Sequence, residues 1–428
     1  MDAHDPDLEH RQRELAELDA ATKRLTVCGV AFLNDAYDMF AINIVAMIMG
    51  FNTVPQKWDT LIKIAVQLVM GRLGDKIGRT TVYAASLMIA IFTTIASAFS
   101  NSMVKGMNVF CVLFIWRVLL GFGIGGDYPI TATIVSEYAN VHNRGKLMAA
   151  VFAFQGFGNV LAPIVSGKID EDVENLDYVW RLIIGLGCIP GESARFQKQA
   201  QEDTNAIETA VPVASRPAGH VGGQRRIKTF KMYFGEWRHL KVLLGTSIAW
   251  FALDVAFYGI NLNSSVVIDA IGFAGDMDKD TPSHYLTRNC VGNIIINMLG
   301  SVPGYWVSVF TIERLGRKKI QILGFVMLTI LYVILGFAYN RLLDNSSVAF
   351  IVLFAFAQFF QNFGPNVTSF VIPGEVFPTR FRATAHGISA AAGKLGAIVA
   401  QGGFLQLKDI GGKNATLEEI CDESEEYY

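Results

Sequence analysis

Long apolar runs separated by short polar segments fill most of this 428-residue chain. A helix that crosses the hydrocarbon core of a bilayer needs about 20 apolar residues, with a rise of about 1.5 Å each. The pattern therefore predicts membrane-spanning helices over 25–51, 61–73, 81–99, 109–138, 146–168, 179–190, 242–270, 290–311, 319–340, 347–372 and 384–407. Residues 61–70 of the second run, before the charged loop motif, supply only ~15 Å of apolar helix, and the sixth run supplies ~18 Å. No apolar run follows Leu407.

The composition agrees with a membrane protein. Hydrophobic residues make up 52% of the chain and charged residues only 17%, whereas a soluble domain carries about 25% charge. We therefore expect an all-α polytopic protein with the lipid bilayer as its surroundings. The net charge of −2 says little about partners, because charge in such a protein is distributed by side of the membrane.

Basic residues mark one side of the predicted bundle. They concentrate in alternate short connections, which carry Arg72, Lys76, Arg79, Arg144, Lys146, Arg314, Arg317, Lys318, Lys319, Arg380 and Arg382. By the positive-inside rule these connections are cytosolic. The same rule predicts a cytosolic N-terminal tail over 1–24 and a cytosolic linker over 191–241, between transmembrane halves at 25–190 and 242–407; an acidic tail covers 408–428.

The two halves repeat the same loop motifs at equal spacing. The string G-R-L-G-D-K-I-G-R ends at Arg79, and T-I-E-R-L-G-R-K-K contains Arg317. Glu137 follows Arg79 by 58 residues, and Glu375 follows Arg317 by the same number. Equal spacing of charged loop motifs predicts two halves related by an axis normal to the membrane.

Charged residues also occur inside the apolar runs. Trp250, Asp254 and Tyr258 are spaced four apart and form one stripe of a helix. A charge at bilayer depth costs ~2.5–3.5 kcal/mol on insertion scales, so such a carboxylate needs a proton, a partner or water. The other intramembrane charges are Asp35, Asp38, Asp127 and Lys394. This set predicts an ion- or proton-coupled pathway.

The loop motifs resemble those of the major facilitator superfamily, in its sugar-porter-like branch. The strings G-G-D-Y-P, W-F-A-L-D-V-A-F-Y-G-I-N-L-N, F-G-P-N and G-K-L-G-A are similar to fungal and plant high-affinity phosphate:proton symporters. The resemblance implies two pseudo-symmetric six-helix halves, here with spans 2 and 6 foreshortened and span 12 absent. It also implies secondary active uptake of inorganic phosphate with protons by alternating access.

The resemblance further implies a phosphate site and proton-coupling acids. The residues that match the phosphate site are Tyr128, Gln155, Trp250, Asp254, Tyr258 and Asn366, and those that match the proton pathway are Asp35, Asp38, Asp127 and Asp254. An ionised Asp254 repels the anion, whereas a protonated one donates a hydrogen bond to it. Proton binding at this residue would therefore create the anion site.

The remaining charges have two predicted uses. Lys394 either attracts phosphate as a point charge or forms an ion pair with Asp127 or Asp35 when the pocket is empty. The loop charges are expected to pair across helices in one conformation and part in the other. These gating residues are Asp75, Arg79, Glu137, Arg144, Glu313, Arg317, Glu375 and Arg382.

Other functions find less support in the sequence. The chain has no nucleophile and base pair typical of an enzyme, no metal-ligand spacing, no cofactor motif and no nucleic-acid surface. Two alternatives stay open: a phosphate-sensing receptor-like carrier without net transport, and another sugar-porter-like proton symporter. We expect a multi-pass protein of the plasma membrane with a cytosolic N-terminus; the oligomeric state is undetermined by sequence.

Overall fold

The computed structural model describes residues 22, 25–42, 44–45, 72–73, 75–76, 79–100, 109–139, 143–167, 176–187, 229–261, 264, 267–268, 273, 282–339, 341–342 and 347–411. The predicted N-terminal tail, the apolar run of the second span, most of the linker and most of the acidic tail lie outside these residues, apart from a few positions. The regular secondary structure of the described residues is helical, as the apolar pattern predicts.

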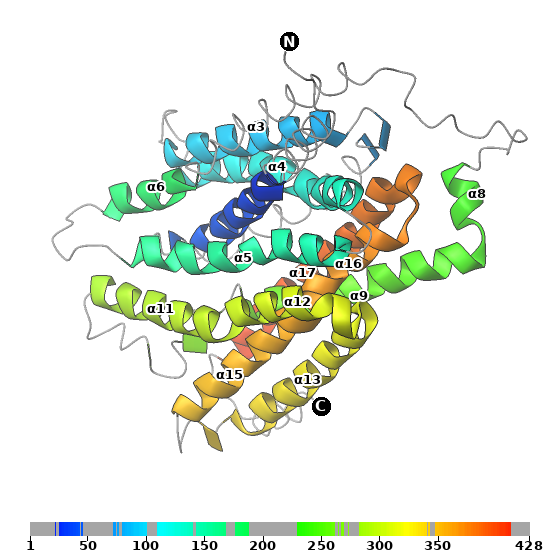
Figure 1. The fold of residues 1–428 in the computed structure, drawn as a ribbon. Helices are drawn as coiled ribbons and strands as arrows, with labels where there is room; N and C mark the ends of the chain where they lie inside the picture. Colours follow the sequence, from blue (N-terminus) through cyan, green and yellow to red (C-terminus); the bar gives the residue numbers. More distant parts are fainter. Residues whose placement is uncertain are drawn as a thin grey trace, which may run out of the picture.

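The N-terminal half consists of helices that match the predicted spans closely. They are Leu25–Ile42, α3 (Arg79–Ala98), α4 (Val109–Tyr138), α5 (Arg144–Ser166) and α6 (Leu176–Leu186). Helix α6 is described over 11 residues, about 16 Å of helix, and residues 188–190 of the predicted sixth span lie outside the described part of the chain. In Figure 1 these helices, blue to teal, occupy the upper part of the molecule.

The C-terminal half, green to red in Figure 1, lies mostly below them and to their right. Its helices are α9 (Trp237–Asn261), α11 (Pro282–Ile296), α12 (Val302–Leu315), α13 (Arg317–Phe337), α15 (Ser347–Gln361), α16 (Val367–Val376) and α17 (Arg382–Gly411). Short segments η3 (Asn297–Ser301), η4 (Asn362–Asn366) and η5 (Thr379–Phe381) join several of them. Among the described residues of both halves, seven helices are long and apolar enough to cross a membrane.

The described residues include the end of the predicted linker. A short helix, α8 (Phe230–Phe234), precedes α9, which starts at Trp237 rather than near 242. The ring of Phe230 lies 5.6 Å from that of Phe381, and the ring of Phe234 lies 5.8 Å from that of Phe377. Burial of these aromatic rings holds the end of the linker against the loop between α16 and α17.

A layer of aromatic rings joins the two halves. Phe152 of α5 stacks on Phe370 of α16 with ring centroids 4.7 Å apart, and Phe32 meets Phe370 edge-on at 5.3 Å. All three side chains are buried. Stacked and edge-on rings are favourable beyond the area they bury, so this layer stabilises contact between the halves.

The π-helical turn η4 interrupts the long helix formed by α15 and α16. Pro365 lies within it, and Phe363 departs from helical geometry with ψ of 19°. Proline lacks the N–H that an α-helix needs, and the wider turn accommodates this loss. Asn362 and Asn366, at the two ends of η4, are buried. Such turns are frequent at functional sites.

Two glycines of α17 bring this helix close to α9. A Cβ on Gly396 would collide with the backbone carbonyl of Phe251, and a Cβ on Gly393 would lie 2.9 Å from the Asp254 carboxylate. Small residues allow this backbone approach, which is a common way to pack helices in membranes. The approach places the middle of α17 directly against the charged stripe of α9.

We predict that Gly396→Ala lowers the stability of the protein, because the added methyl group meets backbone that cannot rotate away. Overpacking of this kind costs about 1–3 kcal/mol. The measurement is the midpoint of thermal unfolding in detergent. Gly245→Ala on α9 is the matched control, since nothing lies within 4 Å of its Cβ position. Equal midpoints for the two variants would contradict the close packing of α9 and α17.

Candidate substrate and ion site

A buried ion pair lies at the centre of the molecule. Lys394 of α17 places its Nζ 3.1 Å from Asp254 Oδ2 and donates a hydrogen bond to Tyr258 Oη at 2.6 Å. Asp254 is 3% exposed and Lys394 4%. The ammonium also lies 4.3 Å from the ring centroid of Tyr258 and 5.4 Å from that of Tyr128, within cation–π distance of both.

This geometry corrects the predicted partner of Lys394. The sequence analysis favoured Asp127 or Asp35, but the structure pairs the lysine with Asp254. The reason is the packing of α17 on α9: Gly393, next to Lys394, leaves room for the side chain of Asp254. Which helices are neighbours depends on tertiary packing, and the spacing of charges along the chain does not contain that information.

A second polar cluster adjoins the ion pair and crosses between the halves. Gln155 Nε2 donates to Tyr128 Oη at 2.9 Å, and Tyr305 Oη donates to Gln155 Oε1 at 3.1 Å. Asn366 Nδ2 in turn lies 2.7 Å from Tyr305 Oη and 2.8 Å from Asn362 Oδ1. Tyr128 and Gln155 belong to the N-terminal half, and the other three residues belong to the C-terminal half.

The six residues predicted to bind phosphate thus come together. Tyr128 links the two clusters, because its hydroxyl accepts from Gln155 while its ring faces Lys394. The ring of Trp250 lies 6.5 Å from that of Tyr128. All six side chains are buried; they are Tyr128, Gln155, Trp250, Asp254, Tyr258 and Asn366.

Sequence reasoning missed Tyr305. It lies in the apolar run 290–311 and is fully buried, with hydrogen bonds to both halves. A tyrosine in such a run is usually a packed aromatic residue, and nothing in its spacing distinguishes it. A weak signal was present in the preceding Gly304, which packs against the Phe359 carbonyl and brings α12 close to the end of α15.

The three other intramembrane acids lie in the N-terminal half. Asp35 and Asp38 are buried on the helix Leu25–Ile42, and Asp38 Oδ2 accepts a hydrogen bond from Thr94 at 3.2 Å. Asp127 is also buried, next to Ser86 of α3, and it forms no ion pair among the described residues.

Sequence reasoning also missed Arg117, a second intramembrane cation. It is buried in α4, and its Nη2 lies 3.5 Å from the backbone carbonyl of Asp38. Arg117 precedes Asp127 by ten residues in the same apolar run, so its position in the run was the available signal.

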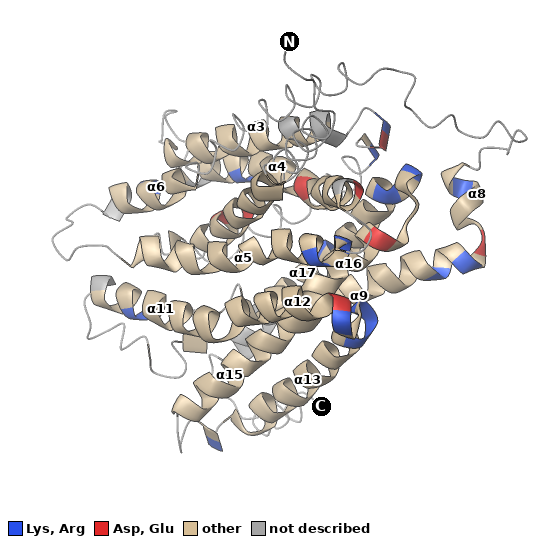
Figure 2. Cartoon of the chain, viewed as in Figure 1, with Lys and Arg blue, Asp and Glu red and all other residues tan. Residues whose placement is uncertain are grey.

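Hydrogen bonds join the halves at the end that carries the basic loops. Asp75 accepts bonds from the backbone N–H and the hydroxyl of Thr384, and Arg382 Nη1 donates to Ser136 Oγ at 3.0 Å. The backbone N–H of Lys146 donates to Glu313 at 3.1 Å. Figure 2 shows basic segments gathered near this end, around α8 and the turn between α12 and α13. This end is therefore closed.

Arg317 is the centre of the charge cluster at this end. It forms ion pairs with Glu313 at 2.6 Å and with Glu375 at 2.7 Å, and Gly145 of the opposite half packs against its guanidinium. Two other predicted gating residues are Glu137, exposed on the last turn of α4, and Arg144, half-buried at the start of α5. The side chain of Arg79 lies outside the described part of the structure.

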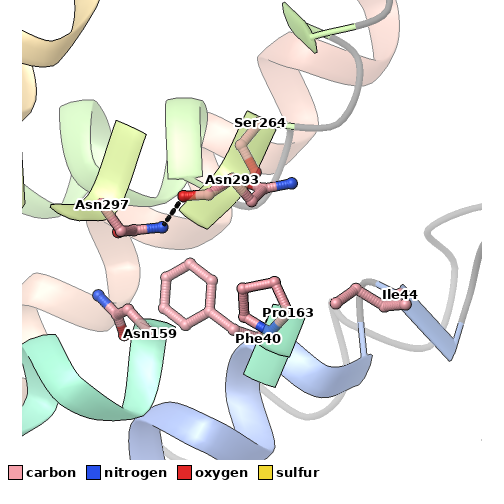
Figure 3. Close-up of a pocket in the computed structure, with 7 residues that line it drawn as sticks. All are labelled: Phe40, Ile44, Asn159, Pro163, Ser264, Asn293 and Asn297. Carbon is pink, nitrogen blue, oxygen red and sulfur yellow. Dashed lines mark hydrogen bonds between the residues drawn. The ribbon is translucent and has the colours of Figure 1, made fainter. Parts of the chain in front are cut away.

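The opposite end of the interface contains a small cavity, shown in Figure 3. It has room for about one water molecule. Its lining comes from both halves: Phe40, Ile44, Asn159, Pro163, Ser264, Asn293 and Asn297. Asn159 is one helical turn beyond Gln155 on α5, so the cavity lies next to the amide and tyrosine cluster.

Comparison with a solved structure shows the fold of the chain. The chain superposes on the major facilitator proton:xylose symporter XylE with a TM-score of 0.69 at 16% identity, over 92% of this chain and 90% of that one. The class of protein comes from the sequence: the model of the sugar (and other) transporter family matches residues 60–416. The chain therefore belongs to this family of transporters.

Within that family the chain is similar to phosphate transporters of fungi. It is 36% identical to the repressible high-affinity phosphate permease of Neurospora crassa, over 94% of this chain and 82% of the relative. It is 38% identical to the inorganic phosphate transporter PHO84 of Saccharomyces cerevisiae, over 92% and 78%. The family resemblance carried by the sequence motifs is thereby confirmed.

We predict that Lys394→Met destabilises the protein, because it leaves the buried Asp254 carboxylate without its cation. Breaking a buried pair from one side costs about 3–5 kcal/mol. The double variant Lys394→Met/Asp254→Asn should recover most of that loss, since it removes the unpaired charge as well. The measurement is a double-mutant cycle of unfolding midpoints.

The loss in Lys394→Met should also shrink as the pH falls, because protonation neutralises Asp254. Lys319→Met is the control, since Lys319 is exposed on α13. Purely additive effects of the two central substitutions would show that these residues do not interact.

Proposed function

We propose that this chain takes up inorganic phosphate together with protons by alternating access of its two halves. The observation that carries the proposal is the meeting of six residues in one buried cluster that spans both halves. The similarity to the Neurospora crassa and Saccharomyces cerevisiae phosphate transporters supports phosphate as the substrate.

The cluster offers the donors that a tetrahedral monoanion requires. Lys394 supplies a positive charge, Gln155 and Asn366 supply amide N–H groups, and Tyr128 and Tyr258 supply hydroxyls. These groups are buried away from water. Hydrogen bonds to an anion are stronger in such a buried site than in solvent. Their placement on both halves means that a bound anion contacts both at once and can close one onto the other.

The ion pair provides the coupling to protons. While Asp254 is ionised it holds Lys394 at 3.1 Å and repels an anion. A proton on Asp254 cancels that attraction, so Lys394 is released to the phosphate, and the neutral carboxyl becomes a further donor. Loss of the proton restores the ion pair and expels the anion. Proton and phosphate therefore bind together or not at all.

Asp35, Asp38 and Asp127 handle the proton on its way to or from this site. The buried carboxyl of Asp127 supports this role, because it forms no ion pair among the described residues and can therefore bind and release a proton without breaking one. The gating role belongs to the charged cluster around Arg317 and to the bonds of Asp75 and Arg382, which hold one end closed.

The orientation follows from the distribution of basic residues. The closed end carries Arg317, Lys318, Lys319, Arg380 and Arg382, which the positive-inside rule assigns to the cytosol together with the N-terminus. The small cavity of Figure 3 then lies toward the outside, as expected for a carrier of the plasma membrane that admits phosphate there.

The direct test is uptake of radiolabelled phosphate into proteoliposomes with an acidic exterior. We expect accumulation above equilibrium that a protonophore abolishes. Arsenate should compete, because it shares the shape and protons of phosphate, and sulfate should compete poorly, because near neutral pH it has no proton to donate. Binding without flux would instead indicate a receptor, and equal inhibition by sulfate would contradict the proposed pocket chemistry.

We predict that Asp254→Asn abolishes proton-driven accumulation, because asparagine keeps a donor but cannot release a proton. Phosphate binding should survive, and the pH dependence of uptake should flatten. Glu236→Gln, at an exposed acid before α9, serves as the control for expression and general charge effects. Accumulation by Asp254→Asn with the normal pH profile would rule out coupling through this carboxyl.

A further inference from the structure

Tyr305 connects the two halves in the centre of the molecule through a single hydroxyl. We propose, resting on the function proposed above, that this hydroxyl takes the place of substrate in the empty carrier. It satisfies Gln155 and Asn366 when the halves close without phosphate, and so permits the empty carrier to return. A symporter needs this step in every cycle, because it must close both fully loaded and fully empty.

The hydroxyl is well placed for this role. It donates to Gln155 Oε1 at 3.1 Å, across the interface between α12 and α5, and accepts from Asn366 Nδ2 at 2.7 Å. Its ring is fully buried and is held by close packing: a Cβ on Gly156 would lie only 2.8 Å from Tyr305 Cδ2. The position of the hydroxyl is therefore fixed by the fold.

The other donors of the cluster are also occupied by protein. Gln155 Nε2 is bonded to Tyr128, and Lys394 is bonded to Asp254 and Tyr258. Protein side chains thus bond the same polar groups that are proposed to bind the anion. Burying polar groups without partners costs free energy, so an empty site lacking these bonds would resist closure.

Removal of the hydroxyl should affect only one branch of the cycle. In the loaded carrier the amides of Gln155 and Asn366 turn to phosphate and do not depend on Tyr305. In the empty carrier each loses one hydrogen bond, and closure becomes less favourable. A residue changes an equilibrium only through its differential interaction with the two states, and here the difference falls on the empty carrier.

The test compares two fluxes in proteoliposomes containing Tyr305→Phe. Phosphate–phosphate exchange uses the loaded carrier alone, whereas net uptake also needs the empty carrier to return. We expect net uptake to fall about tenfold or more, the effect on a rate of losing two hydrogen bonds. Exchange should stay within about twofold of the original chain.

Tyr332→Phe is the matched control. The Tyr332 hydroxyl on α13 is buried and has no hydrogen-bond partner among the described residues, so its removal deletes the same atom without breaking a bond. This variant should keep both fluxes. Elution as a single species in size-exclusion chromatography verifies that both variants fold.

Two results would overturn this inference and leave the proposed function standing. The first is an equal loss of exchange and net uptake in Tyr305→Phe, which would make Tyr305 a ligand of phosphate or a structural residue. The second is that both fluxes of Tyr305→Phe are unchanged. Absence of both fluxes in the original chain would overturn the proposed function and this inference with it.

Discussion

A charge inside a bilayer must be neutralised, and the arrangement of this molecule follows from how that is done for Asp254 and Lys394. Each alone would cost ~2.5–3.5 kcal/mol on insertion scales. Paired at 3.1 Å, they need α9 and α17 to be in backbone contact, which Gly393 and Gly396 permit. Other polar side chains contact this pair. Tyr258 and Tyr128 contact the ammonium of Lys394, and the hydrogen-bonded cluster continues from Tyr128 through Gln155 toward η4. The buried polar site is therefore a consequence of helix packing as much as of chemistry.

The halves meet in three layers of different character. The polar cluster is followed by the aromatic layer of Phe32, Phe152 and Phe370, and then by the charged and hydroxyl contacts of Asp75, Arg317 and Arg382. Apolar stacking is insensitive to small shifts in angle, whereas ion pairs and hydrogen bonds require specific distances. A rocking motion of the halves would thus break the outer contacts abruptly and slide the inner rings past one another.

Much of this architecture was predictable from the sequence, for a physical reason. A membrane-spanning helix is apolar over most of its length, so its position appears directly in the composition of the run. Repeated charged loops revealed the two halves, and the spacing of Trp250, Asp254 and Tyr258 placed them on one buried face. The partner of Lys394, the bridging position of Tyr305 and the π-turn η4 were not predictable. Each depends on contacts between helices more than 50 residues apart or on a local departure from helical geometry, which periodicity does not encode.

The different exposure of the two ion-pair sites has a consequence for their response to salt. The bonds of Arg317 to Glu313 and Glu375 lie at a partly exposed helix end, where mobile ions enter and weaken attraction over a distance of about 8 Å at physiological ionic strength. The pair of Asp254 and Lys394 is sealed within the bundle, and mobile ions do not reach it. In the proposed cycle, salt therefore acts on the cluster around Arg317 and changes how readily that end opens, while the coupling of proton to anion at the buried pair is untouched.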